Sequence, residues 1–200
     1  MALRGIPSIA PAGYVGRPTG ATNLIANGDF ETDATGWTAQ GAGTGVTSQT
    51  PTAGAAPFGA KVGRITGSSS TNARIFQTVV VNPTQGAAYK GQGRIRAGNA
   101  GAVGLTALVQ LQEVGGAMAS NVSTTLVTLT ADWQYLQVTR TVVQADRTAL
   151  DFYIGVFDAA VEAGDQIEVD GCQAEPGPVA TPYIETDGAT ATRQPLKVIA

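Results

Sequence analysis

Apolar and polar residues alternate in short runs along residues 22–176, and glycine- or proline-rich turns separate the runs. The alternation is clearest at 148–157, where Leu150, Phe152, Ile154 and Val156 fall on one side of an expected strand. β-branched and aromatic residues predict further strands at 74–81, 89–97, 103–113, 124–130, 133–143 and 167–170. No long segment keeps the apolar period of a helix. This pattern predicts an all-β fold, an antiparallel β-sandwich.

Three details of this pattern lead to specific expectations. Ile167 and Val169 should face the core from the last strand. Ala131-Asp132, between two expected strands, should form a hairpin turn or a tight bend. Cys172 is the only cysteine, which excludes an intrachain disulfide and fits synthesis in a reducing cytoplasm. We expect Cys172 to be a small buried apolar residue rather than a reactive thiol.

The segments on either side of the β pattern differ from it in composition. Residues 1–21 are rich in Pro and Gly but carry isolated apolar residues, which favours an extended docking arm over a free tail. Residues 177–200 predict a second extended arm. The chain is therefore expected to hold one sandwich domain, 22–176, between two arms. The expected arm anchors are Leu3, Ile6, Ile9, Tyr14, Tyr183, Ile184, Leu196, Val198 and Ile199.

Composition narrows the classes of partner. Hydrophobic residues make up 43% of the chain, enough for a core, but charged residues only 14%, against about 25% in ordinary globular proteins. Such a surface suits a protein that is packed into an assembly or lies outside the cell. The 12 Lys and Arg residues are scattered, so nucleic acid is not expected as a partner. No membrane span and no signal peptide are expected either, because no apolar stretch is long enough.

The absence of histidine limits the chemistry. It removes Ser-His-Asp and Cys-His nucleophilic sites and histidine zinc sites. Carboxylates that lie close in sequence could serve glycoside hydrolysis only across a sugar-binding cleft, which no pattern indicates, so we expect no enzymatic activity. A structural Ca²⁺ is the one candidate cofactor, with Glu31 and Asp170 as ligands if the first and last strands lie side by side. The alternative is that both carboxylates are solvated or bound to backbone N–H groups.

Aromatic residues are scarce, at 6% of the chain. Trp37, Phe76, Trp133 and Phe152 lie in strand-like runs and are expected in the core. Few aromatic side chains are then left to stack on a sugar. Tyr89, Tyr135 and Tyr153 are the remaining candidates for ligand binding.

The segment 23–31, Asn-Leu-Ile-Ala-Asn-Gly-Asp-Phe-Glu, with Gly36-Trp37 resembles the opening of carbohydrate-binding modules of families 4 and 9. The resemblance continues through Phe-Gln-Thr-Val-Val-Val-Asn-Pro at 76–83, Thr-Leu-Thr-Ala-Asp-Trp-Gln at 128–134 and Ile-Glu-Val-Asp at 167–170. It implies a jelly-roll sandwich, a glycan ligand and a structural calcium near the first and last strands. Gly171 departs from the closing motif, in which the family has a second acid.

Residues 172–189, which contain Ala-Thr-Pro-Tyr-Ile at 180–184, are similar to a segment that ends lectin-like domains of bacteriophage virion proteins. This resemblance implies a non-enzymatic virion structural protein made in the host cytoplasm. The leading hypothesis is a capsid decoration or cement protein that docks its arms on the major capsid protein or other virion proteins, as a homo-oligomer and by expectation a trimer. The alternative is a tail, baseplate or fibre-associated carbohydrate-binding module that recognises host-surface glycans.

Overall fold

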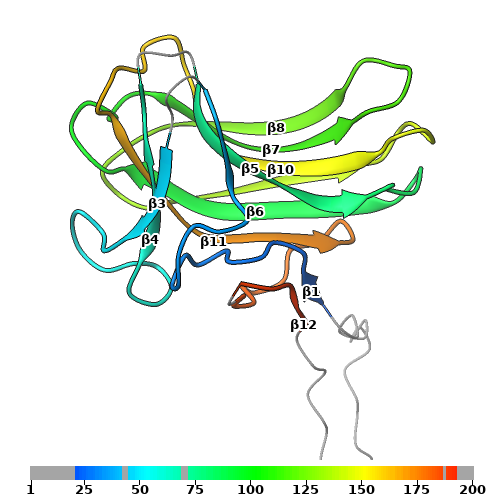
Figure 1. The fold of residues 1–200 in the computed structure, drawn as a ribbon, viewed down its shortest axis with the longest axis horizontal. Helices are drawn as coiled ribbons and strands as arrows, with labels where there is room; N and C mark the ends of the chain where they lie inside the picture. The colour runs from blue at the N-terminus through cyan, green and yellow to red at the C-terminus, as the bar shows by residue number, and fades with distance from the viewer. Residues whose placement is uncertain (1–20, 42–44, 69–71, 187, 193–200) are drawn as a thin grey trace, which may run out of the picture.

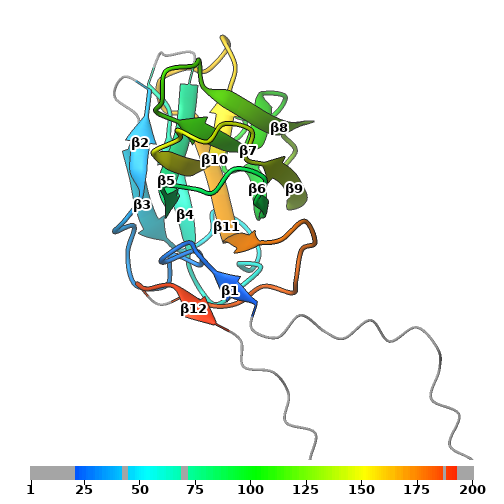
Figure 2. The same ribbon diagram turned by 90° about the vertical axis from the view of Figure 1, so that its right-hand side faces the viewer.

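Two five-stranded antiparallel sheets pack face to face in the computed structural model, which describes residues 21–41, 45–68, 72–186 and 188–192 (Figures 1 and 2). The upper sheet of Figure 1 has the order β2 (Thr38–Gln40), β5 (Asn72–Val81), β10 (Ala149–Phe157), β7 (Thr106–Val114) and β8 (Asn121–Thr128). The lower sheet has the order β3 (Gly45–Gln49), β4 (Val62–Thr66), β11 (Gln166–Pro176), β6 (Ala88–Ala97) and β9 (Gln134–Thr141). β1 (Thr22–Asn23) pairs with β12 (Ala191–Thr192). The predicted all-β sandwich is confirmed.

The described residues form strands, turns and loops, and none of them belongs to a helix with the length and hydropathy needed to cross a membrane. The bend at Ala131-Asp132 links the two sheets, because β8 pairs with β7 whereas β9 pairs with β6. The hairpin alternative is therefore wrong and the tight bend is correct. Leu129, just before the bend, is buried, and its N–H donates to the carbonyl of Leu105 at 2.9 Å.

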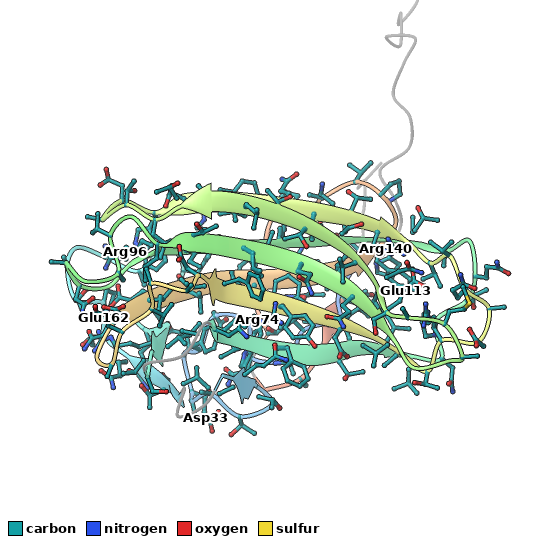
Figure 3. The ribbon with its side chains drawn as sticks, turned by 90° about the horizontal axis from the view of Figure 1, so that it is seen from above. Asp33, Arg74, Arg96, Glu113, Arg140 and Glu162 are labelled. Carbon is teal, nitrogen blue, oxygen red and sulfur yellow. The ribbon has the colours of Figure 1, made fainter. Side chains whose placement is uncertain are left out.

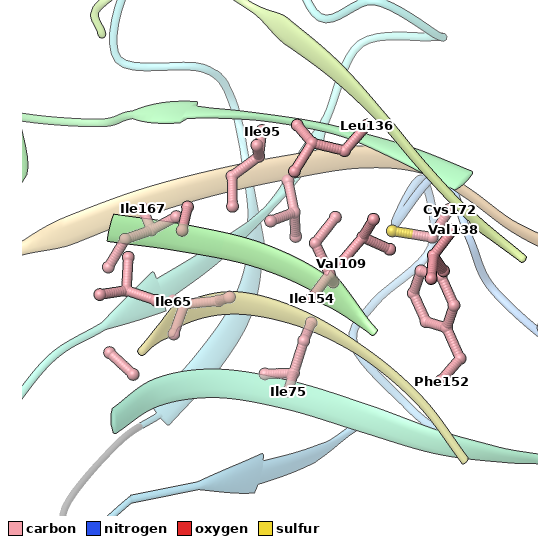
Figure 4. Packing of buried hydrophobic residues seen from close by; sticks show 14 of the residues in the cluster. Ile65, Ile75, Ile95, Val109, Leu136, Val138, Phe152, Ile154, Ile167 and Cys172 are labelled. Atoms are coloured by element: carbon pink, nitrogen blue, oxygen red, sulfur yellow. The ribbon is translucent and has the colours of Figure 1, made fainter. Parts of the chain in front are cut away.

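The core lies between the sheets and follows the predicted alternation (Figure 4). The four apolar residues of β10 are fully buried, and so are Ile167 and Val169 of β11. Cys172 is buried among them, and burial raises the pKa of its thiol well above the ordinary value. A thiol that stays protonated in an apolar setting behaves as a packing group.

The segment between β1 and β2 ties the first strand to the last. Phe30 and Trp37 stack at a centroid distance of 5.3 Å within the core. Asn23 is fully buried, and its side-chain amide donates to the carbonyls of Cys172 and Ile184. Since these bonds join residues far apart in sequence, β1 and β11 lie side by side, as the sequence hypothesis for calcium required.

Gly28 lies at the contact between the β1–β2 segment and β11. Its N–H donates to Thr186 Oγ1 and its carbonyl accepts from the N–H of Cys172, both at 2.9 Å. A Cβ at this position would lie under 3.0 Å from the Cys172 carbonyl oxygen, which is backbone and cannot swing away. The absence of a side chain therefore permits the close approach of the two segments.

Gly28→Ala is expected to destabilise the fold by about 1–3 kcal/mol, as overpacking of a tight site does. Urea unfolding followed by circular dichroism measures the effect. Gly45→Ala is the matched control, because a Cβ there meets no atom within 4 Å. Equal stability of the two variants would contradict this account of the junction.

Two buried glutamates each hold two arginines at opposite ends of the sandwich. Glu168 pairs with Arg64 at 2.9 Å and Arg96 at 2.6 Å, and Arg96 also lies 4.6 Å from the Trp133 ring. The expectation that Trp133 lies in the core is wrong, because its ring is only half-buried beneath this cation. In the second cluster, Glu113 at the end of β7 pairs with Arg140 and Arg147. Figure 3 labels Glu113 and Arg140.

Candidate functional site

The outer face of the upper sheet carries one row of side chains across five strands. The register places Thr38 beside Phe76, Phe76 beside Tyr153, Tyr153 beside Gln110 and Gln110 beside Thr124. Neighbouring positions along these strands, such as Ile75 and Ile154, point into the core. Because side chains alternate between the faces of a strand, the row points outward.

An aromatic pair occupies the middle of this face. The rings of Phe76 and Tyr153 stack at a centroid distance of 5.0 Å. The guanidinium of Arg74 lies 4.8 Å from the Tyr153 ring and 5.3 Å from the Phe157 ring, and Figure 3 shows Arg74 near the centre of the sheet. Its Nε donates to Gln40 Oε1 at 2.6 Å. Burial lowers the pKa of Arg74, which nevertheless keeps its charge at neutral pH.

Polar groups flank the aromatic pair on the side away from Arg74. Asp151 Oδ1 accepts a hydrogen bond from Thr78 Oγ1 at 2.7 Å, and burial raises the pKa of Asp151. Gln110 donates to Gln112 at 2.9 Å and accepts from Thr124 at 3.2 Å. We call the five residues Arg74, Phe76, Gln110, Asp151 and Tyr153 the upper-face site.

The chemistry of the upper-face site suits a sugar. Aromatic faces take the apolar C–H faces of a pyranose ring, whereas sugar hydroxyls need both donors and acceptors. The site holds an arginine donor, a carboxylate acceptor and an amide that can do both, and Asp151 and Gln110 are each 6% exposed. No part of the chain that the structure describes crosses this face in Figures 1 and 3.

The outer face of the lower sheet, by contrast, is covered by the chain itself. Thr52 of the loop before β4 donates its N–H to Glu168 at 2.8 Å. The segment after β11, residues 177–186, which we call the strap, crosses the same face. Within the strap, the Thr181 N–H donates to Glu175 and the Ile184 N–H to Gln173, each at 2.7 Å. Much of the lower sheet is therefore closed to a large ligand.

The three candidate tyrosines lie in three different places. Tyr153 belongs to the upper-face site, where it is 5% exposed because Phe76 and Arg74 pack against its ring. Tyr89 is only 9% exposed and packs in the core. Tyr135 is 49% exposed on the outer face of the lower sheet, where its hydroxyl is hydrogen-bonded to Gln92. The structure thus brings none of the three together.

Sequence reasoning missed Arg74, Phe76, Gln110 and Asp151, and it placed Phe76 in the core. Phe76 is half-buried and outward-facing, so that expectation is wrong. The signal was present in the alternation, since Asp151 and Tyr153 occupy the positions opposite to the apolar residues of β10. What the pattern could not show is the register that lines up β5, β10 and β7.

The expected arm anchors fall partly within the described residues. Leu3, Ile6, Ile9 and Tyr14, and likewise Leu196, Val198 and Ile199, lie outside them. Ile184 is 7% exposed and Tyr183 packs against Phe58 at 4.3 Å between ring centroids. The prediction that these two residues dock on a neighbouring subunit is corrected: both are held against the domain of their own chain, because the strap binds β11.

Backbone amides hold the two expected calcium ligands. Glu31 Oε1 accepts hydrogen bonds from the N–H groups of Ala60 and Lys61, both at 2.7 Å. Asp170 Oδ2 accepts one from the Phe58 N–H at 2.8 Å. Hydrogen bonding to backbone N–H groups, the alternative expected from the sequence, therefore describes both carboxylates, although each keeps lone pairs for another partner.

The carboxylates of Asp29, Glu31 and Asp170 lie at this end of the sandwich. Burial, opposed by backbone hydrogen bonds and assisted by the nearby charges of Asp29 and Glu31, raises the pKa of Asp170 to about 8. Hard oxygen donors with excess negative charge fit Ca²⁺ in kind. Among the described residues, however, no three His, Cys, Asp or Glu side chains gather closely enough to hold a metal ion. Backbone carbonyls or waters would have to supply the remaining ligands.

Comparison with known proteins points to sugar-binding folds. The family model CBM_4_9, a carbohydrate binding domain, matches residues 22–159. No protein of curated function matches the chain significantly. Two similar structures are "Family 16 Carbohydrate Binding Module-2" and the CBM22-1 xylan-binding domain from Paenibacillus barcinonensis. The first is 22% identical with a TM-score of 0.55 and covers 76% of this chain and 99% of its own. The second is 20% identical with a TM-score of 0.60, and the match covers 82% of this chain and 100% of the xylan-binding domain.

A virion protein appears among the similar structures as well. The enzymatically active domain of tailspike protein 4 from bacteriophage CBA120 is 12% identical with a TM-score of 0.54. The match covers 78% of this chain but only 21% of that one. At identities this low, the three structures show a shared jelly-roll fold.

Proposed function

Since the chain belongs to the carbohydrate binding domain family, we propose that it is a non-catalytic module that binds a glycan on the outer face of the upper sheet. The observation that carries this proposal is the stacked pair of Phe76 and Tyr153, flanked by Arg74 and Asp151, on a face that no described segment covers. A glycan chain lying across the strands would meet aromatic faces in the middle and polar groups on both sides.

This proposal reverses the order of the two hypotheses drawn from the sequence. From the sequence, glycan recognition was the second hypothesis, because few aromatic residues are left over once the core is filled. The structure supports it, because Phe76, Tyr153 and Phe157 all lie on the outer face. Capsid decoration depended on docking arms, and most of their anchors lie outside the described residues while Ile184 is buried in its own domain.

Location in a bacteriophage virion remains part of the proposal. Its support is the sequence of residues 172–189, which is similar to segments of virion proteins. A position in the tail, baseplate or fibre suits a module that recognises host-surface glycans. The expected homo-oligomer, a trimer, also stays a prediction.

Purified protein applied to immobilised glycans tests the proposed function. Saturable binding to a defined set of neutral or acidic oligosaccharides is expected, with no change in the length of the glycans over hours. Failure to bind any glycan on a broad array, by a protein shown to be folded, would overturn it. Shortened glycans would instead indicate an enzyme.

We further propose that Ca²⁺ binds at Glu31 and Asp170 and stabilises the junction of residues 23–31 with β11. At a hundredfold excess over its Kd, an ion that binds only the folded state adds about 2.7 kcal/mol. We therefore expect Ca²⁺ to raise the melting temperature by ~5 °C or more over a chelator-treated sample. Asp170→Asn should remove the response, and Glu162→Gln at an exposed position should keep it. An equal melting temperature with and without Ca²⁺ would refute the site.

A further inference from the structure

A cavity lies on the opposite side of the molecule from the upper-face site. It has a volume of about 370 Å³ and opens on the outer face of the lower sheet between the strap and β9. Its lining includes the aromatic residues Phe58, Tyr135 and Tyr183 and the polar residues Gln92 and Arg94. That volume is at the lower end of the ~300–1,000 Å³ that small-molecule pockets have.

Gly171 makes one wall of this cavity possible. A Cβ at position 171 would lie under 3.0 Å from the ring of Phe58. Gly171 is also the residue at which the chain departs from the acidic closing motif of the family it resembles. The Phe58 ring therefore packs over a position that a side chain would otherwise fill.

Arg94 is the unusual group in the cavity. Its guanidinium lies 5.4 Å from the Phe58 ring centroid and 5.3 Å from that of Tyr135. It is half-buried, yet in the described part of the chain it has neither a hydrogen-bond acceptor nor an ion-pair partner. Each of the other arginines on the strands of the lower sheet that the structure describes has an ion-pair partner: Arg64 and Arg96 bind Glu168, and Arg140 binds Glu113. Arg94 thus presents a set of unused donors between two aromatic faces.

The other polar groups of the cavity are already engaged. Gln92 donates to the Thr181 carbonyl at 3.0 Å and is hydrogen-bonded to the Tyr135 hydroxyl. The same hydroxyl accepts from Gln137 at 2.5 Å. A ligand must therefore bring acceptors to Arg94 rather than donors. A guanidinium fork matches the two oxygens of a carboxylate, and the rings suit a flat or ring-shaped body.

We propose that this cavity binds a carboxylate carried on a six-membered ring, and specifically a hexuronic acid residue of an acidic glycan. The carboxylate pairs with Arg94, while the sugar ring lies against Tyr135 and the strap. The cavity is separate from the upper-face site and rests on different residues. Loss of glucuronate binding at this cavity can therefore be distinguished from loss of glycan binding at the upper-face site.

The test is saturation-transfer NMR on the full chain with three probes: D-glucuronate, neutral D-glucose and benzoate. Glucuronate is expected to bind at least ~10-fold more tightly than glucose, since only glucuronate offers a charged acceptor. Benzoate separates a sugar site from a general aromatic-acid site. Binding of benzoate alone, equal binding of glucose and glucuronate, or no glucuronate binding would each overturn the proposal.

Two variants locate the binding. Arg94→Met should weaken glucuronate binding at least ~10-fold, and Arg94→Lys should restore little of it, because lysine lacks the planar fork. Both variants should fold, because Arg94 has no hydrogen bond or ion pair to lose and both replacement side chains are long enough to stay in contact with the Phe58 and Tyr135 rings; unchanged melting curves check this. Arg74→Met alters the upper-face site and should leave glucuronate binding in this cavity intact. Loss of the signal in Arg74→Met but not in Arg94→Met would place the ligand on the other sheet and refute the cavity.

Discussion

Replacing Phe76 by alanine is expected to lower glycan affinity about 30-fold, equivalent to ~2 kcal/mol. The ring is half-buried, outward-facing and stacked on Tyr153, so its loss removes the surface on which a sugar ring rests. Aromatic residues at the centre of an interface commonly carry most of the binding energy. Isothermal titration calorimetry with the strongest glycan from an array measures the loss.

The chain offers a matched control for this experiment. Tyr135→Ala also removes an accessible ring, but on the opposite sheet. It should change the affinity for the array glycan less than about twofold if that glycan is neutral and so has no reason to enter the Arg94 cavity. Weakened binding in Tyr135→Ala with unchanged binding in Phe76→Ala would move the glycan site to the lower sheet.

Glu113→Ala is expected to destabilise the fold by about 3–5 kcal/mol, the usual result of breaking a buried ion pair from one side. Glu113 is fully buried, accepts from Arg140 Nε at 2.7 Å and lies 3.3 Å from Arg147 Nε. Arg147 is itself buried, so the variant leaves its charge without an anion. Chemical unfolding quantifies the loss, and Glu162→Ala at an exposed site should stay within ~0.5 kcal/mol of the wild type.

The same cluster makes part of the stability depend on pH. Burial alone would raise the pKa of Glu113, but hydrogen bonds from Arg140 and from the Val143 and Gln144 N–H groups lower it below the ordinary 4.5. A carboxyl with a lowered folded pKa stabilises the protein above its unfolded pKa and loses that contribution as pH falls. The stability difference between wild type and Glu113→Ala should therefore shrink below about pH 4.5. A difference that is constant from pH 7 to pH 3 would contradict the ion-pair account.

The alternation of apolar residues predicted the core face of β10 and β11 because burial of one face leaves a direct trace in sequence. Ile154 and Val169 could be assigned to the core from the alternation alone, without knowing which strands lie beside them. The bend at Ala131-Asp132 was harder, since the same turn residues serve a hairpin or a crossing between sheets. Only the partners of β8 and β9 decide between the two.

The binding face could be predicted only in part, because it depends on strand register. Phe76 and Tyr153 are separated by 77 positions in sequence, and the row that contains them exists only after β5 and β10 pair. A half-buried aromatic on the outer face also looks like a core residue in a short apolar run. The strap shows the same limit: its proline-rich sequence indicated an extended segment, but not that Ile184 would be buried on the chain's own β11.

The most direct test of the central claim is to map the bound glycan by amide chemical shifts in a ¹⁵N-labelled sample. Titration with the array-selected oligosaccharide should shift amides of β5, β7 and β10, centred on Phe76, Gln110 and Tyr153. Amides of β4, β6 and β9 should move little with a neutral glycan. Shifts confined to the lower sheet, or none on β5 and β10 at saturation, would contradict glycan binding on the upper face.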